Sequence, residues 1–418
     1  MNPNLLDKHS NRRLINLALA PFCLCPLFSV AQANFSLQTS PSPNPHGTSL
    51  NAVSATSNTD AWAVGYKNDN NLNDSRTLIE HWNGNDWKTV PSPNPGSTAN
   101  CKGFNTGNVL NSVTVISPTD AWAVGLMFNC GSLIKPLALH WDGLRWRKVK
   151  TPVLNTNDNA ALNSVAAFAS NDVYAVGYQP APNGAVLTLI EHWDGSSWKV
   201  VPSPNANATG NVLSSVSGKS STDIWAVGDI VSPNNPVLTL VEHFDGAHWS
   251  VVPSPNPLPT GSLNQNVLTS VQANSAADVT AAGFVLNSGQ QTVTTLIEHW
   301  DGMLWKVIPS PNKSTVAGSI NTLRSVTGTA GTNLYAAGFF ANAQTGGQQR
   351  TLVEHFDGQN WSIIATPTKG VAQQLQGIFS PTNSTSIWTV GAFSSEQTDP
   401  ETGFLIIPKT LVLFSPGS

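Results

Sequence analysis

Histidine and glutamate recur side by side along this chain of 418 residues, in a pattern that could bind a metal ion. The segment T-L-[IV]-E-H-[WF]-D-G and its variants supply them once per copy. The histidines are His81, His140, His192, His243, His299 and His355, and the glutamates are Glu80, Glu191, Glu242, Glu298 and Glu354. Imidazole and carboxylate groups are common zinc ligands. The first question is therefore whether the fold brings several of them together.

Other catalytic patterns are missing from the sequence. It contains no H-E-x-x-H, G-x-S-x-G, P-loop or G-x-G-x-x-G motif. The segment 69–73, with Asp69, Asn71 and Asn73, resembles a calcium-binding loop but lacks its glycine and final glutamate, so we interpret it as a solvated loop. A sialidase-like site needs an arginine cluster, and the only arginines after residue 33 are Arg76, Arg145, Arg147, Arg324 and Arg350. No residue constellation implies a cofactor.

A second motif, D-x-W-A-V-G, runs in step with the first and defines seven repeats spaced 51 to 60 residues apart. Its copies begin at Asp60, Asp120, Asp172, Asp223, Asp278, Asn333 and Ser386. An L-x-[SAG]-[VI] segment precedes each copy, and a W-x-x-V-P-S-P-N segment or a variant follows the histidine segment in most repeats. Each repeat thus holds four short runs, here called strands a, b, c and d, bounded by Gly, Asp, Asn or Pro. Such runs are typical of β-strands.

Four strands in a repeat of about 50 residues predict one blade of a β-propeller. The segment FSLQTSPSPNP from Phe35 matches a strand d, and TLVLFSPGS from Thr410 matches a strand c. We therefore expect an all-β fold, a seven-bladed propeller with four antiparallel strands per blade. The N-terminal strand d would join the C-terminal strands a to c and close the ring, which removes the exposed sheet edges.

These repeats resemble those of bacterial secreted β-propeller proteins with D-x-W-A-V-G units, which look similar to kelch, WD and Asp-box propellers. The resemblance covers nearly all of the chain after residue 33. A kelch blade carries a Gly-Gly doublet in a strand, whereas the doublet here, Gly346-Gly347, falls in a connection. A WD blade also carries a G-H dipeptide, and only Trp-Asp is present here. No catalytic residue is carried over from these families.

Residues that recur in every repeat are interpreted as structural. The tryptophans of strands b, c and d should pack between neighbouring blades. The Asp that opens strand b should bind backbone amides of the a–b turn, the D-G after the histidine should form a tight turn, and P-S-P-N should end strand d at the outer edge. Strand c lies roughly 10 Å further out than strand a, so histidines of adjacent blades are too far apart to share an ion. Glutamate and histidine then point to opposite faces as structural hydrogen-bonding positions, and no metal is expected.

The first 33 residues have the pattern of an export signal. Lys8, Arg12 and Arg13 precede a mostly apolar segment, 14–30, and Ala31-Gln32-Ala33 fits a small-x-small cleavage site. We expect a signal peptide at 1–33 and the propeller at 34–418, secreted or in the periplasm or cell envelope, without membrane insertion after cleavage. Export favours a disulfide between Cys101 and Cys130, which fall in the d–a and b–c connections of the second repeat.

Composition limits the range of partners. Charged residues make up 11% of the chain and the formal net charge is −4, whereas a nucleic-acid binder needs a basic face. We expect no nucleic-acid partner, and we expect a monomer. The remaining partner classes are glycans, peptides and proteins.

The repeats differ most in their d–a and b–c connections, such as 65–76, 125–135, 338–350 and 391–409. Antiparallel strands place all of these on one side, here called the variable face, and loops on a rigid scaffold commonly bind ligands. The second residue of each strand a lies near this face at the channel mouth. These candidate ligand-binding residues are Asn51, Asn111, Asn163, Ser214, Thr269, Arg324 and Gln376, of which only Arg324 is charged. The other interpretation is a hydrated channel lining.

The sequence favours an exported, non-enzymatic propeller that binds a glycan, peptide or protein through the variable face. One alternative is a propeller carbohydrate-active enzyme, a hydrolase or a lyase. The other is a structural envelope protein. Fold alone does not decide among these functions.

Overall fold

The computed structural model describes residues 33–44, 46–68, 74–96, 106–128, 133–152, 159–206, 209–261, 263–382, 384–395 and 407–417. All of them belong to one compact unit, Gln32–Ser418. Secondary structure in these residues consists of 28 strands and one short 3₁₀ helix, η1 (Ala343–Thr345). The all-β prediction is therefore confirmed.

The strands follow the four expected types. Strand a of the successive repeats is β2 (Thr48–Ser57), β6 (Thr106–Ser117), β10 (Ala161–Ala169), β14 (Asn211–Ser220), β18 (Gln265–Ser275), β22 (Ile320–Ala330) and β26 (Ala372–Phe379). Strand b is β3 (Asp60–Asn68), β7 (Asp120–Phe128), β11 (Asp172–Pro180), β15 (Asp223–Ile230), β19 (Asp278–Asn287), β23 (Asn333–Ala341) and β27 (Ile387–Ser395). Strand c is β4 (Asp74–Trp82), β8 (Ile134–Trp141), β12 (Val186–Trp193), β16 (Leu238–Phe244), β20 (Thr292–Trp300), β24 (Arg350–Phe356) and β28 (Ile407–Ser415). Strand d is β5 (Trp87–Thr89), β9 (Trp146–Val149), β13 (Trp198–Val200), β17 (Trp249–Val251), β21 (Trp305–Val307), β25 (Trp361–Ile364) and β1 (Ser36–Gln38).

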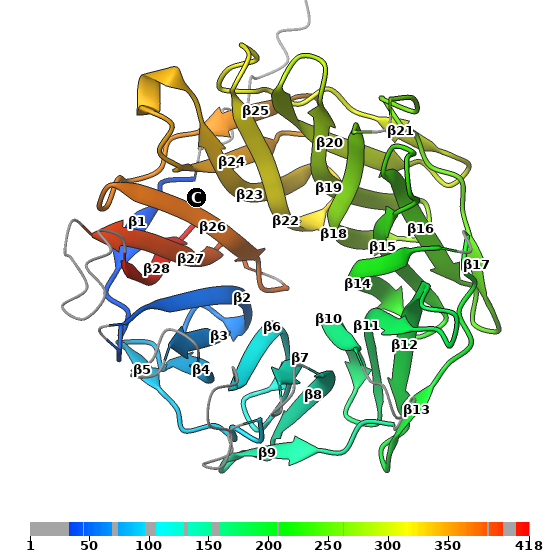
Figure 1. The fold of residues 1–418 in the computed structure, drawn as a ribbon. Helices are drawn as coiled ribbons and strands as arrows, with labels where there is room; N and C mark the ends of the chain where they lie inside the picture. The colour runs from blue at the N-terminus through cyan, green and yellow to red at the C-terminus, as the bar shows by residue number, and fades with distance from the viewer. Residues whose placement is uncertain are drawn as a thin grey trace, which may run out of the picture. The chain divides into compact units, whose positions relative to one another are not determined.

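Within each repeat the strands pair antiparallel in the order a-b-c-d and stand around a common axis (Figure 1). Three sheets contain four strands each. In two further sheets of eight strands, two neighbouring repeats are joined by short parallel pairs, β4 with β6 and β20 with β22. Multiple four-stranded antiparallel units around one axis are the architecture of a β-propeller.

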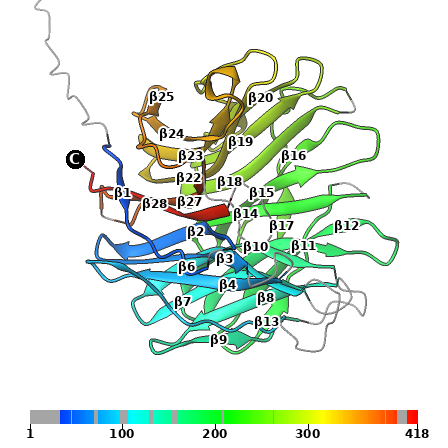
Figure 2. The same cartoon turned by 60° about the vertical axis from the view of Figure 1, so that its left-hand side comes forward.

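The two ends of the described chain meet in one sheet. β1 pairs antiparallel with β28, with Leu37 opposite Leu413, and the sheet order is β1-β28-β27-β26. The turned view places β1 next to β28 (Figure 2). The predicted pairing of the N-terminal strand d with the C-terminal strands is confirmed, and β28 does not become an open edge.

The hydrophobic core is divided among the interfaces between repeats. Each of seven clusters of buried residues combines side chains from two consecutive repeats. Trp62 of the first repeat, for example, packs with Leu110 and Trp146 of the second. The cluster around Trp388 and Trp87 joins the seventh repeat to the first. The predicted packing of the tryptophans between neighbouring repeats is thus confirmed, and the core runs through the junction of the two ends.

The glycine of the D-x-W-A-V-G motif lies where strand b comes closest to strand a. In the third repeat Gly177 pairs with Leu162, and the register shifts immediately afterwards, between Leu162 and Ser164. The bypassed residue, Asn163, is the second residue of the L-x-[SAG]-[VI] segment. A Cβ atom on Gly177 would lie 2.0 Å from the carbonyl oxygen of Ala161. The same approach of 1.9–2.0 Å recurs at Gly65, Gly125, Gly228, Gly283, Gly338 and Gly391. The bulge therefore requires glycine in strand b.

We expect Gly177→Ala to lower the free energy of unfolding by about 2–3 kcal/mol, since overpacking a closely packed site forces the backbone apart. Urea denaturation measures this. Gly289→Ala is the matched control, because the nearest atom to its added Cβ is Asn287 Oδ1 at 3.5 Å, and it should change stability by less than about 0.5 kcal/mol. Equal stability of the two variants would contradict this account of the bulge.

Candidate functional site

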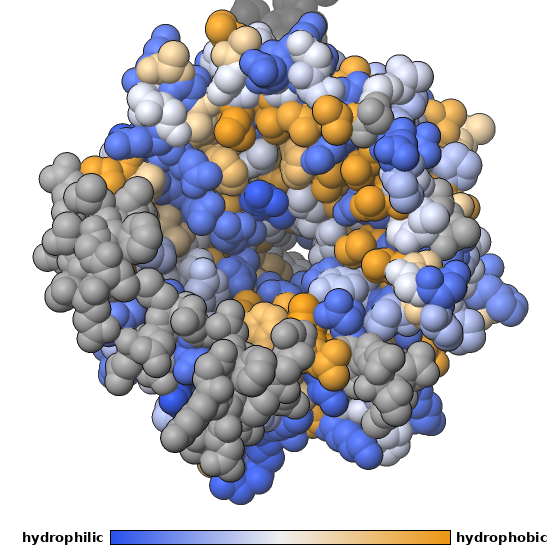
Figure 3. Space-filling view, in the orientation of Figure 1, coloured by the Kyte–Doolittle hydropathy of each residue, from blue (hydrophilic) through white to orange (hydrophobic). Residues whose placement is uncertain are grey.

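The bulge residues of all seven strands a line one central cavity of about 410 Å³. These are the residues singled out from the sequence: Asn51, Asn111, Asn163, Ser214, Thr269, Arg324 and Gln376. The molecular surface is hollowed at its centre, with hydrophilic residues beside the hollow and hydrophobic residues over the strands between β14 and β24 (Figure 3). The structure therefore brings these seven positions, which lie far apart in sequence, to one place.

Several of these side chains tie neighbouring repeats together. Asn51 Nδ2 donates to the carbonyl oxygen of Leu110 in the next repeat at 2.9 Å. Asn111 and Asn163 make the equivalent bonds, and Thr269 Oγ1 donates to the carbonyl oxygen of Leu323 at 2.8 Å. The asparagine amides are thus partly structural, which the sequence did not reveal. Their Oδ1 atoms accept no hydrogen bond among the described residues.

The serine that follows the bulge forms a second link, which sequence reasoning missed. Ser164 Oγ accepts the backbone N–H of Val216 in the next repeat at 3.2 Å, and Ser112, Ser215 and Ser270 accept in the same way. The sequence did contain an indication of this link, since the third residue of the L-x-[SAG]-[VI] segment is small in every repeat. Together the two sets of bonds make the inner wall of the cavity rigid.

Arg324 differs from the rest of the lining. Its guanidinium carbon lies 5.9 Å from the ring centre of Phe284 and 5.6 Å from that of Phe339. Its Nε atom is buried and has no hydrogen-bond partner among the described residues. Burial lowers the pKa of the guanidinium from its ordinary value. Among the described residues that line the cavity, Arg324 is the only ionisable one.

Three further ionisable groups follow the strand-b glycine, at the end of strand b that leads to the variable face. Burial raises the pKa of Asp229 to about 6, and it raises the pKa of Tyr66 and of Tyr178 above the ordinary tyrosine value. None of the three belongs to the cavity lining. The sequence analysis did not single them out.

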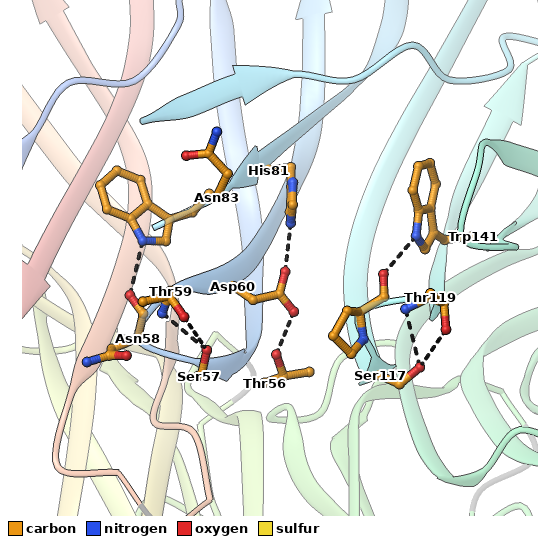
Figure 4. A network of polar contacts seen from close by, with 12 residues as sticks. Thr56, Ser57, Asn58, Thr59, Asp60, His81, Asn83, Ser117, Thr119 and Trp141 are labelled. Carbon is orange, nitrogen blue, oxygen red and sulfur yellow. Dashed lines mark hydrogen bonds and ion pairs between the residues drawn. The ribbon is translucent and has the colours of Figure 1, made fainter. Parts of the chain in front are cut away.

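The repeated histidines are structural, as predicted, and their partner is the aspartate that opens strand b. His81 Nε2 lies 2.7 Å from Asp60 Oδ1, and Thr56 Oγ1 donates to the other carboxylate oxygen (Figure 4). The imidazole also stacks on Trp62, with ring centroids 4.2 Å apart. The same His–Asp contact, at 2.8–3.0 Å, occurs at His140, His192, His243 and His299, and His355 contacts Asn333.

The predicted role of this aspartate was wrong. Its carboxylate binds the histidine rather than amides of the a–b turn, because the side chain points toward strand c across the sheet. The turn is stabilised by its own hydroxyl groups instead. Ser57 Oγ accepts the N–H of Thr59 at 3.2 Å (Figure 4). The indole of Trp82 adds a further bond, from Nε1 to the carbonyl oxygen of Asn58. The D-G turns are as predicted, with φ near +90° at Gly84 and its equivalents.

The P-S-P-N segment follows strand d and folds back onto strand c. Thr188 on β12 donates its backbone N–H to Asn205 Oδ1 at 2.9 Å, and its hydroxyl lies 2.7 Å from Ser203 Oγ. Ser203 also donates to Glu242 Oε2 of the next repeat at 2.8 Å. The segment therefore links two repeats, which adds to the predicted role of ending strand d.

The glutamates beside the histidines are fully buried. Glu80, Glu191, Glu242, Glu298 and Glu354 each have 0% of their surface exposed, and burial raises the pKa of each to about 8. Ser40 and Ser203 donate to Glu80 and Glu242. No hydrogen bond from the described residues reaches the carboxylate oxygens of the other three. The prediction that these glutamates are hydrogen-bonding positions therefore holds for Glu80 and Glu242. It is wrong for Glu191, Glu298 and Glu354, whose carboxyl oxygens accept no hydrogen bond from the described residues.

The remaining sequence predictions are not tested by these contacts. Cys101, Cys130 and the segment 69–73 lie outside the described residues, as do residues 1–32. In the part of the chain that is described, no three His, Cys, Asp or Glu side chains are grouped to hold a metal ion. The same part contains no helix long and apolar enough to cross a membrane.

No protein-family model and no curated protein sequence matches this chain. Its fold resembles solved structures, however. The crystal structure of the WD40 repeats of RRP9 aligns with a TM-score of 0.52 and 9% sequence identity, over 93% of this chain and 99% of that chain. A PL25 polysaccharide lyase, an ulvan lyase, aligns at 0.49 and 10% identity over 91% and 94%. Trypanosoma rangeli sialidase aligns at 0.44 and 11% identity over 87% and 53%. The likeness to the WD40 repeats shows the β-propeller fold.

Proposed function

We propose that this protein is an exported, non-enzymatic, seven-bladed propeller that binds a glycan, peptide or protein at the variable-face end of its central channel. The observation that carries the proposal is the cavity itself. The bulge residues of all seven repeats contribute to its lining, six of them neutral and polar, and Arg324 is the one charged residue in the described lining. The lining also includes apolar side chains further along strand a, such as Val165 and Phe168. Ligand pockets commonly combine a rigid wall with a few converging polar groups of this kind.

The seven-blade count is supported by the core. Each of the seven clusters joins two consecutive repeats, and the cluster around Trp388 joins the seventh repeat to the first. The pairing of β1 with β28 supports one closed ring. A closed ring gives the cavity a wall that does not need a partner chain, which fits a monomer.

A carbohydrate-active enzyme is the alternative. Glycoside hydrolysis uses a pair of carboxyl groups beside the scissile bond, and no carboxyl group is among the described residues of the cavity lining. The observation that favours an enzyme is Asp229, whose pKa of about 6 suits an acid–base group. Turnover of a polysaccharide by the purified protein, lost on Asp229→Asn, would replace the binding proposal with the enzymatic one.

Binding of the purified protein to glycan and peptide arrays tests the proposal directly. We expect saturable binding to one ligand class, abolished or weakened by substitutions at the seven lining positions. Binding that survives every change on the variable face, but fails after changes in the a–b or c–d turns, would place the site on the opposite face. No binding to any array would favour a structural envelope protein.

We further propose that Cys101 and Cys130 form a disulfide on the variable face, as export would allow. Intact-mass measurement after alkylation, with and without reductant, is the test. We expect no alkylated thiol in the unreduced protein that lacks residues 1–33, and two after reduction. Two alkylated thiols before reduction would exclude the bond.

A further inference from the structure

The charged residue of the described lining, Arg324, is held between two aromatic rings, and its Nε donor has no hydrogen-bond partner among the described residues. Arg324 lies on β22, and the two aromatic rings near it come from different repeats, Phe284 from β19 and Phe339 from β23. Cation–π contacts attract the positive charge of the guanidinium. They do not replace the hydrogen-bond acceptors that its five N–H donors can bind. The guanidinium is therefore oriented by the protein and still able to bind an anion.

A buried guanidinium donor without a hydrogen-bond acceptor lowers the stability of the folded protein. Arg324 Nε is buried and has no partner among the described residues, and a buried donor that lacks an acceptor costs free energy, more so when it is charged. The described lining contains no carboxylate that could serve. A ligand oxygen is about as large as a water molecule and does not reach the buried Nε. An oxyanion in the cavity would bind the terminal Nη donors of the same guanidinium, because guanidinium groups bind carboxylate and sulfate oxygens through parallel N–H donors.

The other bulge residues of the lining can hydrogen-bond to hydroxyl groups. Thr269 and Gln376 hold the equivalent position in the repeats on either side of Arg324. Across the ring, Asn51, Asn111 and Asn163 use their Nδ2 atoms for backbone carbonyls, which leaves their Oδ1 atoms as acceptors. Sugar hydroxyls are donors for such acceptors, and a cavity of about 410 Å³ holds a small saccharide.

We infer that the central channel binds an acidic saccharide, whose carboxylate or sulfate group accepts hydrogen bonds from Arg324 while its hydroxyl groups donate to the asparagine side of the ring. This inference rests on the proposed function, because it names the ligand class of the same site. The shared chemistry is a sugar that carries an oxyanion, and the choice between carboxylate and sulfate is made by the test.

Calorimetric titration of the purified protein with three tetrasaccharides makes that test: an oligogalacturonide, a sulfated oligogalactan and the neutral oligogalactan. We expect one of the acidic probes to bind at least about tenfold more tightly than the neutral one. Arg324→Ala should weaken that binding by about 10- to 100-fold, the range for a hydrogen bond to a charged group. Arg324→Lys keeps the charge but loses the paired donors, so it should weaken binding by a smaller factor.

The matched control is Arg145→Ala, which removes the same charge at an exposed position in the c–d turn of the second repeat. It should leave the affinity unchanged, and melting curves should show that all variants are folded. Should Arg324→Ala unfold, the comparison is made with Arg324→Lys alone. Failure of both acidic probes to bind, or equal binding by wild type and Arg324 variants, overturns the inference. Neutral glycans or peptides that still bind on the arrays would then leave the proposed function standing, whereas no binding there would remove both.

Discussion

A chain that lacks residues 34–45 is expected to lose about 5 kcal/mol of stability and to melt at a markedly lower temperature. The deletion removes β1, so the backbone of β28 becomes an exposed sheet edge. It also removes the hydrogen bonds from Ser40 to Thr410 and to Glu80, at 2.8 and 2.7 Å, and the one that Pro41 accepts from Thr410. Each such bond contributes about 1 kcal/mol, and more where a buried group is left without a partner.

The matched control for this deletion is a chain that begins at Ala33 and keeps every described residue. Thermal and urea denaturation compare the two. A synthetic peptide with the sequence of residues 34–45, added in excess to the deleted chain, should restore part of the lost stability, because it can pair with β28. An unchanged melting curve after the deletion, or no effect of the peptide on a destabilised chain, would contradict closure of the ring by β1.

The strands were predictable because they recur with a regular period in the sequence. The pairing of the N-terminal strand with the C-terminal strands was predictable because each end matches one strand type of the repeat. Phe35 and Thr410 each match a strand type of the full repeats, so the meeting of the two ends follows from counting strands. The bulge at Asn163 was not predictable in this way, since it depends on how closely strand a approaches Gly177. The invariant glycine was a signal for close backbone approach, but it does not say which neighbour is close.

The candidate site was predictable in place but not in detail. The second residue of the L-x-[SAG]-[VI] segment does line the cavity, as the ring of repeats implies. That Asn51 bonds to the next repeat, or that Arg324 lies against Phe284, depends on side-chain direction at a bulge, which normal strand alternation does not describe. The pairing of Asp60 with His81 was likewise missed, although Asn333 replaces the aspartate in the sixth repeat as a hydrogen-bonding substitute.

The burial of the glutamates could not be predicted from the sequence, because it depends on how the sheets pack against one another. In a sheet with one solvated face, a charged residue marks the outside. Here both faces of each repeat pack against neighbours, so Glu298 on one face of β20 is as buried as the apolar residues around it. Leucines at the same position in the second and seventh repeats, Leu139 and Leu413, show that the site also accepts an apolar side chain.

Stability of this protein is expected to fall as pH rises from about 4.5 to about 8. The pKa of each buried glutamate is about 8 in the folded protein, against 4.5 for the ordinary group. The folded chain therefore keeps protons that the unfolded chain releases between these values, so unfolding is favoured as pH rises. Each glutamate whose pKa is raised in this way makes the slope of stability against pH more negative within this window and adds nothing outside it. His355 acts in the opposite direction, since burial lowers its pKa. Asp229 acts in the same direction as the glutamates, since burial raises its pKa to about 6.

Glu298→Gln and Glu298→Leu test this account, because each removes one titrating carboxyl group without adding a charge. Both variants should be more stable than the wild type at pH 8, and urea denaturation at several pH values between 5 and 8 should show a slope reduced by about one proton. The control is Asp86→Asn, at an exposed carboxylate whose pKa is lowered by hydrogen bonds from Asn85 and Lys88 and which therefore stays ionised throughout this range. It should leave the slope unchanged. A wild-type stability that is flat or rising between pH 5 and 8 would mean that the buried glutamates are ionised in the folded protein, and that cations or other donors must then reach them.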